Sequence, residues 1–544
     1  MVDGIDPLNE LSIVNEKKEI REKAMENVKE KCMENVINEL MERKEKAKLG
    51  GGPEKIARQH ESGHYTARER IEKLVDPGTF LELGLLAHSD QPGSEEISAG
   101  DGVITGLAKV NGRPIVLQAA DKTVFAATEG MVYFRKTKAA HAFAVKRGFP
   151  LVNLMEGGGL RMPDGMGSDG ISQMLFPDEL LLHHRQVPMV TAILGDSFGG
   201  PTWTAVSSDF VTQVKGTTMA VAGPRMLEIA TGEKVTNEEL GGWQVHANHT
   251  GQVEHFAENE EVAIDELKQF LDYMPLHSGE EPPYRETMDD PYRSLDEVVD
   301  LVPTRQKRAY DMKKVIKQIV DDGTYLELKP SYGPAIITVL ARINGRVVGI
   351  IANNPMQFAG AAGTKESDKA TDFIVLCDSY HIPLIFLHDT PGFRVSSEAE
   401  RLKMPTKIMV WNQALAQSTV PKISVVIRKS IGAAYGNMCG PTMGADFVVA
   451  WPTAEINFTG PEVGINVVYG QQLKNAENPE EEREKLLKLW GFDASPYKAA
   501  GKYLIDDVID PRDTRKFLAQ TLEYACNKNG AKSERLLANW PTGY

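Results

Sequence analysis

The chain contains Ile71-Glu-Lys-Leu-Val-Asp-Pro-Gly-Thr-Phe-Leu-Glu-Leu83 and repeats it as Ile316-Lys-Gln-Ile-Val-Asp-Asp-Gly-Thr-Tyr-Leu-Glu-Leu328. Further along, Leu107-Ala-Lys-Val-Asn-Gly-Arg113 returns as Leu340-Ala-Arg-Ile-Asn-Gly-Arg346, 233 positions later. Self-similarity of this kind marks a structural unit that is used more than once. We therefore predict two copies of one domain.

The register of 233 positions persists well beyond these strings. Lys136 matches Lys369, Glu156 faces Asp389, and Val187-Pro188 faces Val420-Pro421. After a four-residue insertion, Gly223-Pro224 matches Gly460-Pro461 at an offset of 237. The acidic, proline-containing segment 273–303 reads as a connector between the halves. We predict a helical N-terminal arm over 1–53, a first domain over 54–290 and a second domain over 291–544.

Short Val, Ile and Leu runs alternate with longer helical patterns in both halves. Examples are 150–154 and 189–194 in the first half, with 383–387 and 423–427 in the second. Apolar strands bounded by Pro and Gly and separated by amphipathic helices are typical of α/β units with buried sheets. The charged stretch that ends at Gly50-Gly-Gly-Pro53 predicts a helix. This helix either packs along the body with its charged face in solvent or docks a partner.

Composition excludes several classes of protein. The 544 residues are 42% apolar and carry a formal charge of -15, which disfavours binding to a nucleic-acid phosphate backbone. The four cysteines lie far apart, so we expect neither a disulfide framework nor a metal site, and a reduced, cytoplasmic location fits. No apolar run is long enough to cross a bilayer.

Four glycine-containing loops follow buried strands and are the candidate carriers of chemistry. They are Glu156-Gly-Gly-Gly-Leu-Arg161, Gly195-Asp-Ser-Phe-Gly-Gly-Pro-Thr202, Asp389-Thr-Pro-Gly-Phe393 and Arg428-Lys-Ser-Ile-Gly-Ala-Ala-Tyr435. Glycine lets a substrate approach the backbone, and two convergent amides make an oxyanion hole. The alternative is that the glycines only turn the chain, but unconnected turns have no reason to recur in register. Nucleophile elbows, phosphate loops and metal-binding helices are missing, which leaves backbone electrostatics as the mechanism.

Several strings in order resemble the carboxyltransferase family of biotin-dependent enzymes, which includes acyl-CoA carboxylase β subunits, glutaconyl-CoA decarboxylase α subunits and the transcarboxylase core. Among them are Thr66-Ala-Arg-Glu-Arg70, Gly232-Glu-Lys-Val-Thr236, Thr390-Pro-Gly-Phe393 and Gly460-Pro-Glu462. The resemblance implies two tandem crotonase-like domains of the ClpP/crotonase superfamily. It also implies an active site between the first half of one subunit and the second half of another, in a trimer or hexamer.

The resemblance also implies a role for each loop. In the first half, amides of Gly159, Leu160 and Gly200 would hold the acyl-CoA thioester oxygen, with Gly158 and Gly199 lining the site. In the second half, amides of Phe393, Ala433 and Ala434 would hold the ureido oxygen of biotin, with Gly392, Gly432 and Tyr435 around it. Pro201 lacks an N–H, so Gly200 should be the single donor of its loop. Glu156 and Asp389 are candidate acids, or they organise the loops as hydrogen-bond acceptors.

The implied reaction moves a carboxyl group from carboxybiotin to an acyl-CoA through enolate intermediates. Biotin would arrive on a separate carrier protein, because the Ala-Met-Lys-Met attachment string is missing, and a biotin carboxylase would be a further partner. Two alternatives stay open: a decarboxylase subunit that runs the transfer in reverse, and a non-catalytic scaffold subunit. A hydratase on this fold would need paired acids over the thioester, and each loop offers only one.

Overall fold

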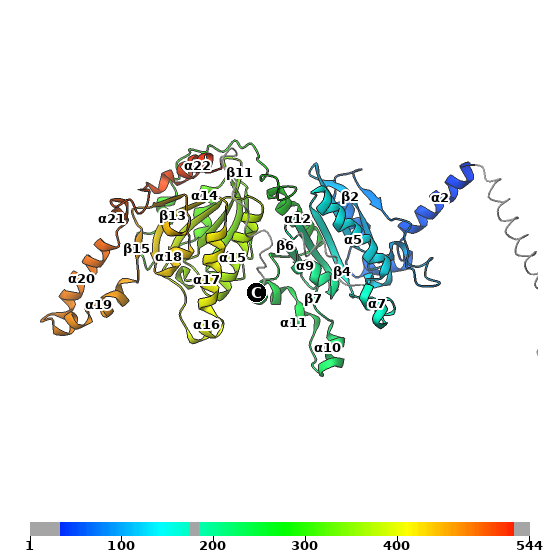
Figure 1. The fold of residues 1–544 in the computed structure, drawn as a ribbon, viewed down its shortest axis with the longest axis horizontal. Coiled ribbons are helices and arrows are strands. Elements are labelled where there is room, and N and C mark those ends of the chain that lie inside the picture. The colour runs from blue at the N-terminus through cyan, green and yellow to red at the C-terminus, as the bar shows by residue number, and fades with distance from the viewer. Residues whose placement is uncertain (1–32, 174–183, 527–544) are drawn as a thin grey trace, which may run out of the picture.

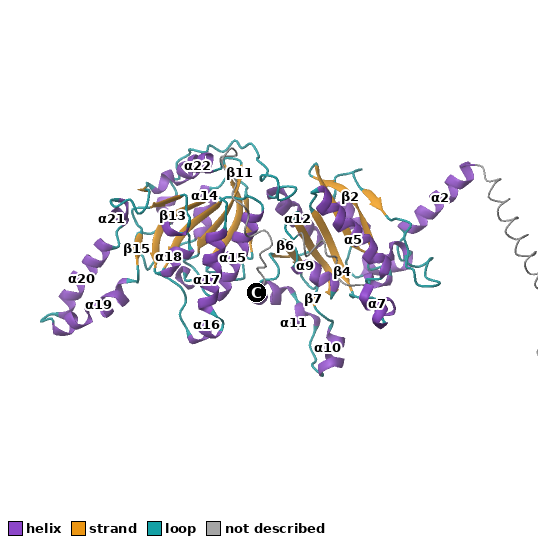
Figure 2. Ribbon diagram, viewed as in Figure 1, coloured by secondary structure: helices purple, strands orange, loops and turns teal. Residues whose placement is uncertain are grey.

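The two sequence repeats fold into two sheets of the same design, side by side along the molecule (Figure 1). The computed structural model describes residues 33–173 and 184–526, and each sheet has eight strands within those ranges. Figure 2 shows that helices flank both sheets. The prediction of two α/β units is therefore confirmed.

The first sheet has the strand order β1-β2-β3-β4-β5-β6-β8, and β7 pairs with β5. The strands are β1 (Leu81–Leu83), β2 (Val103–Val110), β3 (Arg113–Ala120), β4 (Leu151–Gly157), β5 (Met189–Phe198), β6 (Phe210–Val214), β7 (Met219–Ala220) and β8 (His255–Ala257). From β3 onward every pairing is parallel.

The second sheet repeats this order as β9-β10-β11-β12-β13-β14-β16, and β15 pairs with β13. Its strands are β9 (Tyr325–Leu328), β10 (Ile336–Ile343), β11 (Arg346–Asn353), β12 (Leu384–Thr390), β13 (Lys422–Ile431), β14 (Phe447–Ala450), β15 (Glu455–Asn457) and β16 (Asp507–Val508). Each strand of one sheet thus has a counterpart in the other. The apolar runs predicted as strands at 150–154, 189–194, 383–387 and 423–427 lie in β4, β5, β12 and β13.

One tight hairpin in each sheet repeats the same pairing and the same turn residues. Val110 pairs with Arg113 around an Asn-Gly turn, and Ile343 pairs with Arg346 around another. Both turn residues have positive φ, which this sharp turn requires and which Asn and Gly tolerate. A carboxylate caps each turn: Asp76 accepts from the amides of the first and Asp321 from those of the second.

Helices surround the first sheet and begin at recognisable caps, such as the box in which Thr66 and Glu69 satisfy each other's amides. They are α2 (Met33–Lys48), α3 (Pro53–Glu61), α4 (Ala67–Leu74), α5 (Met131–Arg147), α6 (Met162–Gly165), α7 (Gly167–Gln173), α9 (Gly200–Val206), α10 (Pro224–Thr231), α11 (Asn237–Gly241) and α12 (Glu260–Tyr273). The predicted helical arm is present as α2, which has no buried side chain; residues 1–32 of that prediction lie outside the described residues.

The second sheet has an equivalent set of helices and one long addition, the α19 and α20 pair that extends away from the body (Figure 2). The helices are α13 (Val298–Leu301), α14 (Met312–Ile319), α15 (Thr364–Ser379), α16 (Ser397–Arg401), α17 (Met404–Gln417), α18 (Ala433–Asn437), α19 (Pro461–Asn475), α20 (Pro479–Asp493), α21 (Pro496–Ala500) and α22 (Thr514–Ala525). Helix α5 follows β3 as α15 follows β11, so the helices keep the repeat as the strands do.

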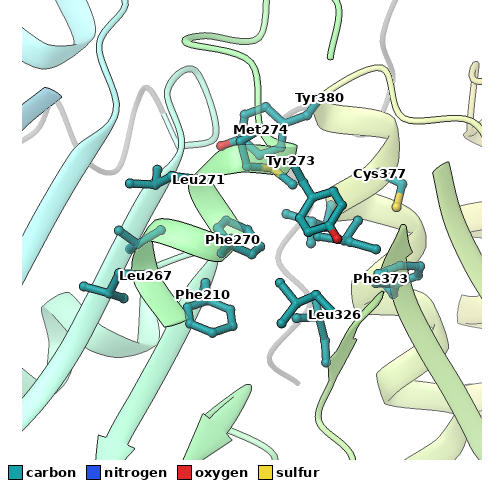
Figure 3. Packing of buried hydrophobic residues seen from close by; sticks show 14 of the residues in the cluster. Phe210, Leu267, Phe270, Leu271, Tyr273, Met274, Leu326, Phe373, Cys377 and Tyr380 are labelled. Atoms are coloured by element: carbon teal, nitrogen blue, oxygen red, sulfur yellow. The ribbon is translucent and has the colours of Figure 1, made fainter. Parts of the chain in front are cut away.

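An apolar core crosses from the first unit into the second around α12 (Figure 3). Phe210 of β6 stacks on Phe270 of α12, with ring centroids 4.9 Å apart. The same cluster continues to Leu326 of β9 and Phe373 of α15. The seam therefore contains a hydrophobic core that is continuous through both units.

Candidate functional site

Each candidate loop leaves the carboxyl end of a central parallel strand. In the first unit β4 ends at Gly157 and β5 ends at Phe198, and Gly157 pairs with Ser197 across the two strands. The register shifts by a bulge between Met155 and Gly157, and the same shift occurs 233 positions later between His388 and Thr390. Loops at this edge of a parallel sheet are where ligands commonly bind.

The two loops of the first unit touch each other through glycine. A Cβ added to Gly159 would lie 2.7 Å from the carbonyl oxygen of Phe198, and one added to Gly199 would lie 3.8 Å from the Cα of Gly159. Both glycines have left-handed φ, +77° at Gly159 and +67° at Gly199. A side chain at Gly159 would force the loops apart, so these glycines fix the spacing of the backbones as well as turning the chain.

Main-chain bonding around these loops leaves particular amides free. A bridge joins residue 129 to residue 160, with the Glu129 amide donating to the carbonyl of Gly159 (2.8 Å) and the Arg161 amide donating to the carbonyl of Glu129 (2.9 Å). The Gly199 amide donates to Ala220 at 3.1 Å. Within the described residues, the amides of Gly159, Leu160 and Gly200 make no hydrogen bond. The three amides predicted as donors are thus available to a ligand.

The second unit repeats this arrangement at the matching positions. A bridge joins Ala362 to Phe393, and the Gly432 amide donates to the carbonyl of Asn457 at 2.8 Å. The amides of Phe393, Ala433 and Ala434 make no hydrogen bond among the residues that the structure describes. Two positions of this free set match the first, Phe393 with Leu160 and Ala433 with Gly200. Each unit adds one of its own: Gly159 in the first, and in the second Ala434, which stands where the first unit has Pro201.

The other loop residues predicted to line the sites are placed beside these amides, and their own amides are used in the fold. Gly158 donates to Ala126 at 3.4 Å, and Gly392 donates to the hydroxyl of Thr390 at 3.2 Å. The Tyr435 amide closes the turn onto Gly432 at 3.1 Å, and its ring lies edge-on to His388 with centroids 6.0 Å apart. Burial raises the pKa of Tyr435 to about 12, so the side chain stays neutral.

The two candidate acids are organisers of the loops. Glu156 is buried and pairs with Arg70 of α4, whose guanidinium also binds Glu260. Asp389 is buried and pairs with Arg428 at 2.8 Å and with Lys429 at 3.2 Å. Carboxylates paired in this way anchor the carboxyl ends of β4 and β12. The structure thus supports the second of the two roles considered for Glu156 and Asp389, in which they organise the loops as hydrogen-bond acceptors.

Sequence reasoning assigned no role to a pair of arginines that brace the loops from the side. Arg161 lies over the ring of Phe125 at 4.8 Å, and Arg394 lies over the ring of Phe358 at 4.2 Å. Arg161 also binds Asp101 at 2.6 Å and the carbonyl of Thr128 at 2.8 Å. The signal was present in the sequence, because each arginine and each phenylalanine is 233 positions from its counterpart.

Sequence reasoning also missed Glu129, an acid that no loop motif contains. Its side chain is 7% exposed, and burial raises its pKa to about 7. A Cβ added to Gly200 would fall 2.0 Å from one carboxyl oxygen of Glu129 and 2.3 Å from the other. The repeat register again held the signal. It aligns Glu129 with Ala362, so the acid is a difference between two otherwise matched positions.

Two further classes of site were sought in the parts of the chain that the structure describes. Residues 33–173 and 184–526 contain no cluster of three or more His, Cys, Asp and Glu side chains arranged to hold a metal ion. Over the same ranges, no helix has both the length and the apolar character that crossing a membrane would take.

Comparisons with known proteins agree over nearly the whole chain. Residues 58–539 match the carboxyl transferase domain. The propionyl-CoA carboxylase carboxyltransferase subunit of Haloferax mediterranei is 36% identical over 511 residues, which are 92% of this chain and 98% of that protein. The methylmalonyl-CoA carboxyltransferase 12S subunit of Propionibacterium freudenreichii is 35% identical over 92% of this chain and 96% of its own length.

Two more relatives bear on the chemistry and on the fold. The methylmalonyl-CoA decarboxylase subunit alpha of Propionigenium modestum is 35% identical over 92% of this chain and 96% of its own length. The transcarboxylase 12S crystal structure, a hexamer solved with methylmalonyl-coenzyme A and methylmalonic acid bound, superimposes with a TM-score of 0.87. That alignment covers 93% of this chain and 98% of the solved chain at 34% identity.

Proposed function

The chain belongs to the carboxyl transferase domain family, and from this premise we propose that it is the carboxyltransferase subunit of a biotin-dependent acyl-CoA carboxylase. The tandem crotonase-like fold expected from the sequence is confirmed by the match to the transcarboxylase 12S structure. The observation that carries the function is the doubled loop pair: two matched sets of unbonded amides at the same edge of two equivalent sheets.

In this proposal the first unit binds the acyl-CoA. The amides of Gly159, Leu160 and Gly200 converge on the thioester oxygen and stabilise the negative charge that it gains when the neighbouring carbon loses a proton. A preformed donor of this kind contributes about 2.7–4 kcal/mol to a transition state. Gly158 and Gly199 leave this edge of the loops without side chains, so the ester can approach the backbone.

The second unit holds the carboxyl donor. Carboxybiotin supplies an activated carboxyl group when it is bound. Amides of Phe393, Ala433 and Ala434 fit its ureido oxygen, because they are the free donors of the matching loops, and Gly392, Gly432 and Tyr435 complete the site. All of these donors belong to the backbone and are fixed before the ligand arrives. Biotin that has given up its carboxyl group would supply the base that takes the proton from the acyl carbon, so no side-chain base is needed.

Assembly completes the site in this proposal, with the first unit of one subunit facing the second unit of another. Two projecting regions support a homo-oligomer, a trimer or a hexamer of two trimers. Helix α10 exposes Met226 and Ile229, and the α19 and α20 pair exposes Val467 and Phe492, the last two at 77% and 69%. Apolar side chains displayed this openly are typical of surfaces that another subunit covers. Sedimentation analysis of the purified chain tests this, and a monomer at micromolar concentration contradicts it.

Further partners follow from the chemistry. Biotin requires a carrier protein and a biotin carboxylase to load it, because this sequence lacks the attachment string for biotin. A cytoplasmic location remains a prediction from the sequence. Co-purification from the native source identifies these partners: a biotinylated carrier together with a biotin carboxylase supports carboxylation.

Decarboxylation is a second candidate, favoured by the similarity to methylmalonyl-CoA decarboxylase alpha subunits. The same amides serve either direction, because the acyl-CoA enolate lies on both paths. Co-purification separates the two: a multi-span membrane subunit beside the carrier indicates decarboxylation.

One experiment tests the transfer itself. The purified chain is incubated with free biotin and, in separate reactions, with malonyl-, methylmalonyl- and glutaconyl-CoA, and loss of the carboxyl group from the thioester is measured. Transfer with any of these supports the proposal. CoA-ester binding by calorimetry without transfer indicates a scaffold subunit, and neither binding nor transfer contradicts the proposal altogether.

A further inference from the structure

Glu129 is held beside the free amides of the first unit by its own backbone. Its amide and its carbonyl are both bonded to the loop after β4, at Gly159 and Arg161. This bridge places the residue next to Leu160. Its carboxyl group reaches across to Gly200, so closely that any side chain at position 200 would collide with it. The carboxyl group therefore lies in the space bounded by the two loops that supply the free amides.

This buried carboxyl group has no ion-pair partner or hydrogen-bond donor within the described residues. Arg161, whose amide bonds to the carbonyl of Glu129, has its guanidinium engaged by Asp101 and Asp164. Tyr133, on the helix that follows, carries a phenol that stays neutral because burial raises its pKa. A carboxylate left alone in such a place is costly, so burial raises the pKa of Glu129 to about 7.

Helix α5, which begins just after Glu129, carries Arg135 and Lys136, and these bind Asp90 and the carbonyls of Gly100 and Val103. Three other segments beside the carboxyl group carry no charge. Helix α9 (Gly200–Val206) has no ionisable residue, nor has the short helix Phe125–Ala127 that precedes Glu129. The loop from Gly157 to Leu160 has none either. An anion there would have no ion-pair partner among the described residues, whereas a neutral acid can use its O–H as a donor.

The second unit lacks this acid. Ala362 occupies the position of Glu129 and makes the equivalent bridge, to Phe393. Ala433 occupies the position of Gly200. The exchange is reciprocal: the unit with the carboxyl group has glycine opposite it, and the unit without one has alanine. A feature confined to one of two otherwise matched sites serves the ligand of that site.

We propose that Glu129, as a neutral carboxylic acid, is a further donor to the acyl-CoA thioester oxygen, beside the amides of Gly159, Leu160 and Gly200. The inference rests on the proposed function, in which the first unit binds the thioester. The O–H bond is not broken, and its hydrogen bond strengthens as the oxygen gains negative charge. In ketosteroid isomerase, a carboxyl group that an apolar site keeps protonated donates a hydrogen bond to the oxyanion in the same way. In its ionised form Glu129 would repel the enolate.

The test compares carboxyl transfer by the full chain and its variants from pH 5.5 to 8.5. In the wild type, kcat/KM is expected to be full below pH 7 and to fall about tenfold per pH unit above it, because the active form is the acid. Glu129→Ala, which copies Ala362, is expected to lose about 100-fold at pH 6. Glu129→Gln keeps a neutral donor, so it is expected to retain more activity than Glu129→Ala and to lose the fall above pH 7.

Glu254→Gln is the matched control. Glu254 is also buried with its pKa raised to about 7, but it lies at the seam between the units and binds Lys329. If Glu129 is the titrating group, Glu254→Gln keeps the wild-type pH profile. A fall that disappears in Glu254→Gln and persists in Glu129→Gln overturns the inference.

A second readout does not depend on turnover. Infrared spectroscopy at pH 6 is expected to show a protonated carboxyl band that shifts when a CoA ester binds and is absent from Glu129→Gln. Wild-type activity without loss in Glu129→Ala, or a Glu129 that is ionised at pH 6, sinks the inference and leaves the carboxyltransferase intact. A wild type that binds CoA esters, shows the shifted band and transfers no carboxyl group contradicts the proposed function alone.

Discussion

The guanidinium of Arg70 and the carboxylate of Glu156 form an ion pair 2.5 Å long in which neither side chain is more than 1% exposed. Arg70 belongs to α4, and Glu156 is the residue before the last of β4. The same arginine binds Glu260 of α12 at 2.7 Å. The start of the glycine loop is therefore tied to two helices that come from opposite ends of the first unit.

Replacement of Arg70 by alanine is expected to cost about 3–5 kcal/mol of unfolding free energy, because it removes the buried cation that two buried carboxylates share. Urea denaturation followed by circular dichroism measures this. Lys73→Ala on the same helix is the control, since its pair with Glu261 is exposed to solvent and little change is expected. Equal effects from the two variants would contradict the assignment of Arg70 as the anchor of the loop.

Gly159→Ala is expected to lower carboxyl transfer by about 100-fold, because the new methyl group pushes the loop away from Phe198 and misplaces the donors. Gly112→Ala is matched to it: Gly112 has the same φ of +77° but open space around its Cβ. Both variants carry a similar strain of about 1–2 kcal/mol. A transfer rate that drops equally in both would mean that backbone strain, and not the contact between the loops, is responsible.

Ala433→Pro tests the second unit by deleting one amide. Position 433 is the first residue of α18, where proline fits a helix and where the amide has no helical partner. Transfer from biotin is expected to fall about 100-fold, while binding of CoA esters to the first unit is unchanged. Ala433→Gly keeps the N–H and is expected to keep most of the activity. The idea fails if the proline variant transfers as fast as the glycine variant.

The buried amine of Lys369 predicts how stability depends on pH. It donates to the carbonyls of Lys329 and Ile336, both at 2.8 Å, and burial lowers its pKa to about 7. The unfolded chain takes up this proton below about pH 10 and the folded chain only below pH 7. The contribution to stability therefore rises from pH 7 to pH 10, by up to about 1.4 kcal/mol per pH unit, and is flat below pH 7.

Lys369→Met removes that dependence. Urea denaturation at several pH values measures the stability of the wild type minus that of the variant, and this difference is expected to grow between pH 7 and pH 10. Lys138→Met, at an exposed position of α5, is expected to leave a constant difference. A constant difference for Lys369→Met as well would mean that the folded chain protonates this amine as readily as the unfolded chain does.

Most of the fold was predictable because the chain encodes it twice. The strings at 71–83 and 316–328 end in β1 and β9, and the Asn-Gly pairs became the two matched hairpins. A register of 233 positions then carried each assignment from one half to the other. The domain limits at 53 and 290 remain predictions, and 1–32 of the arm, with part of the last domain, lies outside the described residues.

The site was only partly predictable. The loop positions followed from strands and glycines, which are local signals. Which amides are free depends on the bridges from Glu129 to Leu160 and from Ala362 to Phe393, and these join segments that sequence patterns treat separately. The contact of Glu129 with Gly200 is likewise non-local, so an acid outside the motifs received no role.

The hydrophobic seam at α12 also determines what would happen to a nicked molecule. Phe270 and Phe373 belong to different halves of the chain but to one cluster, and Tyr380 adds a 2.7 Å hydrogen bond to Asp209 across the same junction. Cleavage in the connector between α12 and α13 would leave the two fragments associated through this hydrophobic core. The two fragments would stay together as one complex, because side-chain contacts hold the halves together. Once the chain has folded, the peptide connection between them is no longer needed for this.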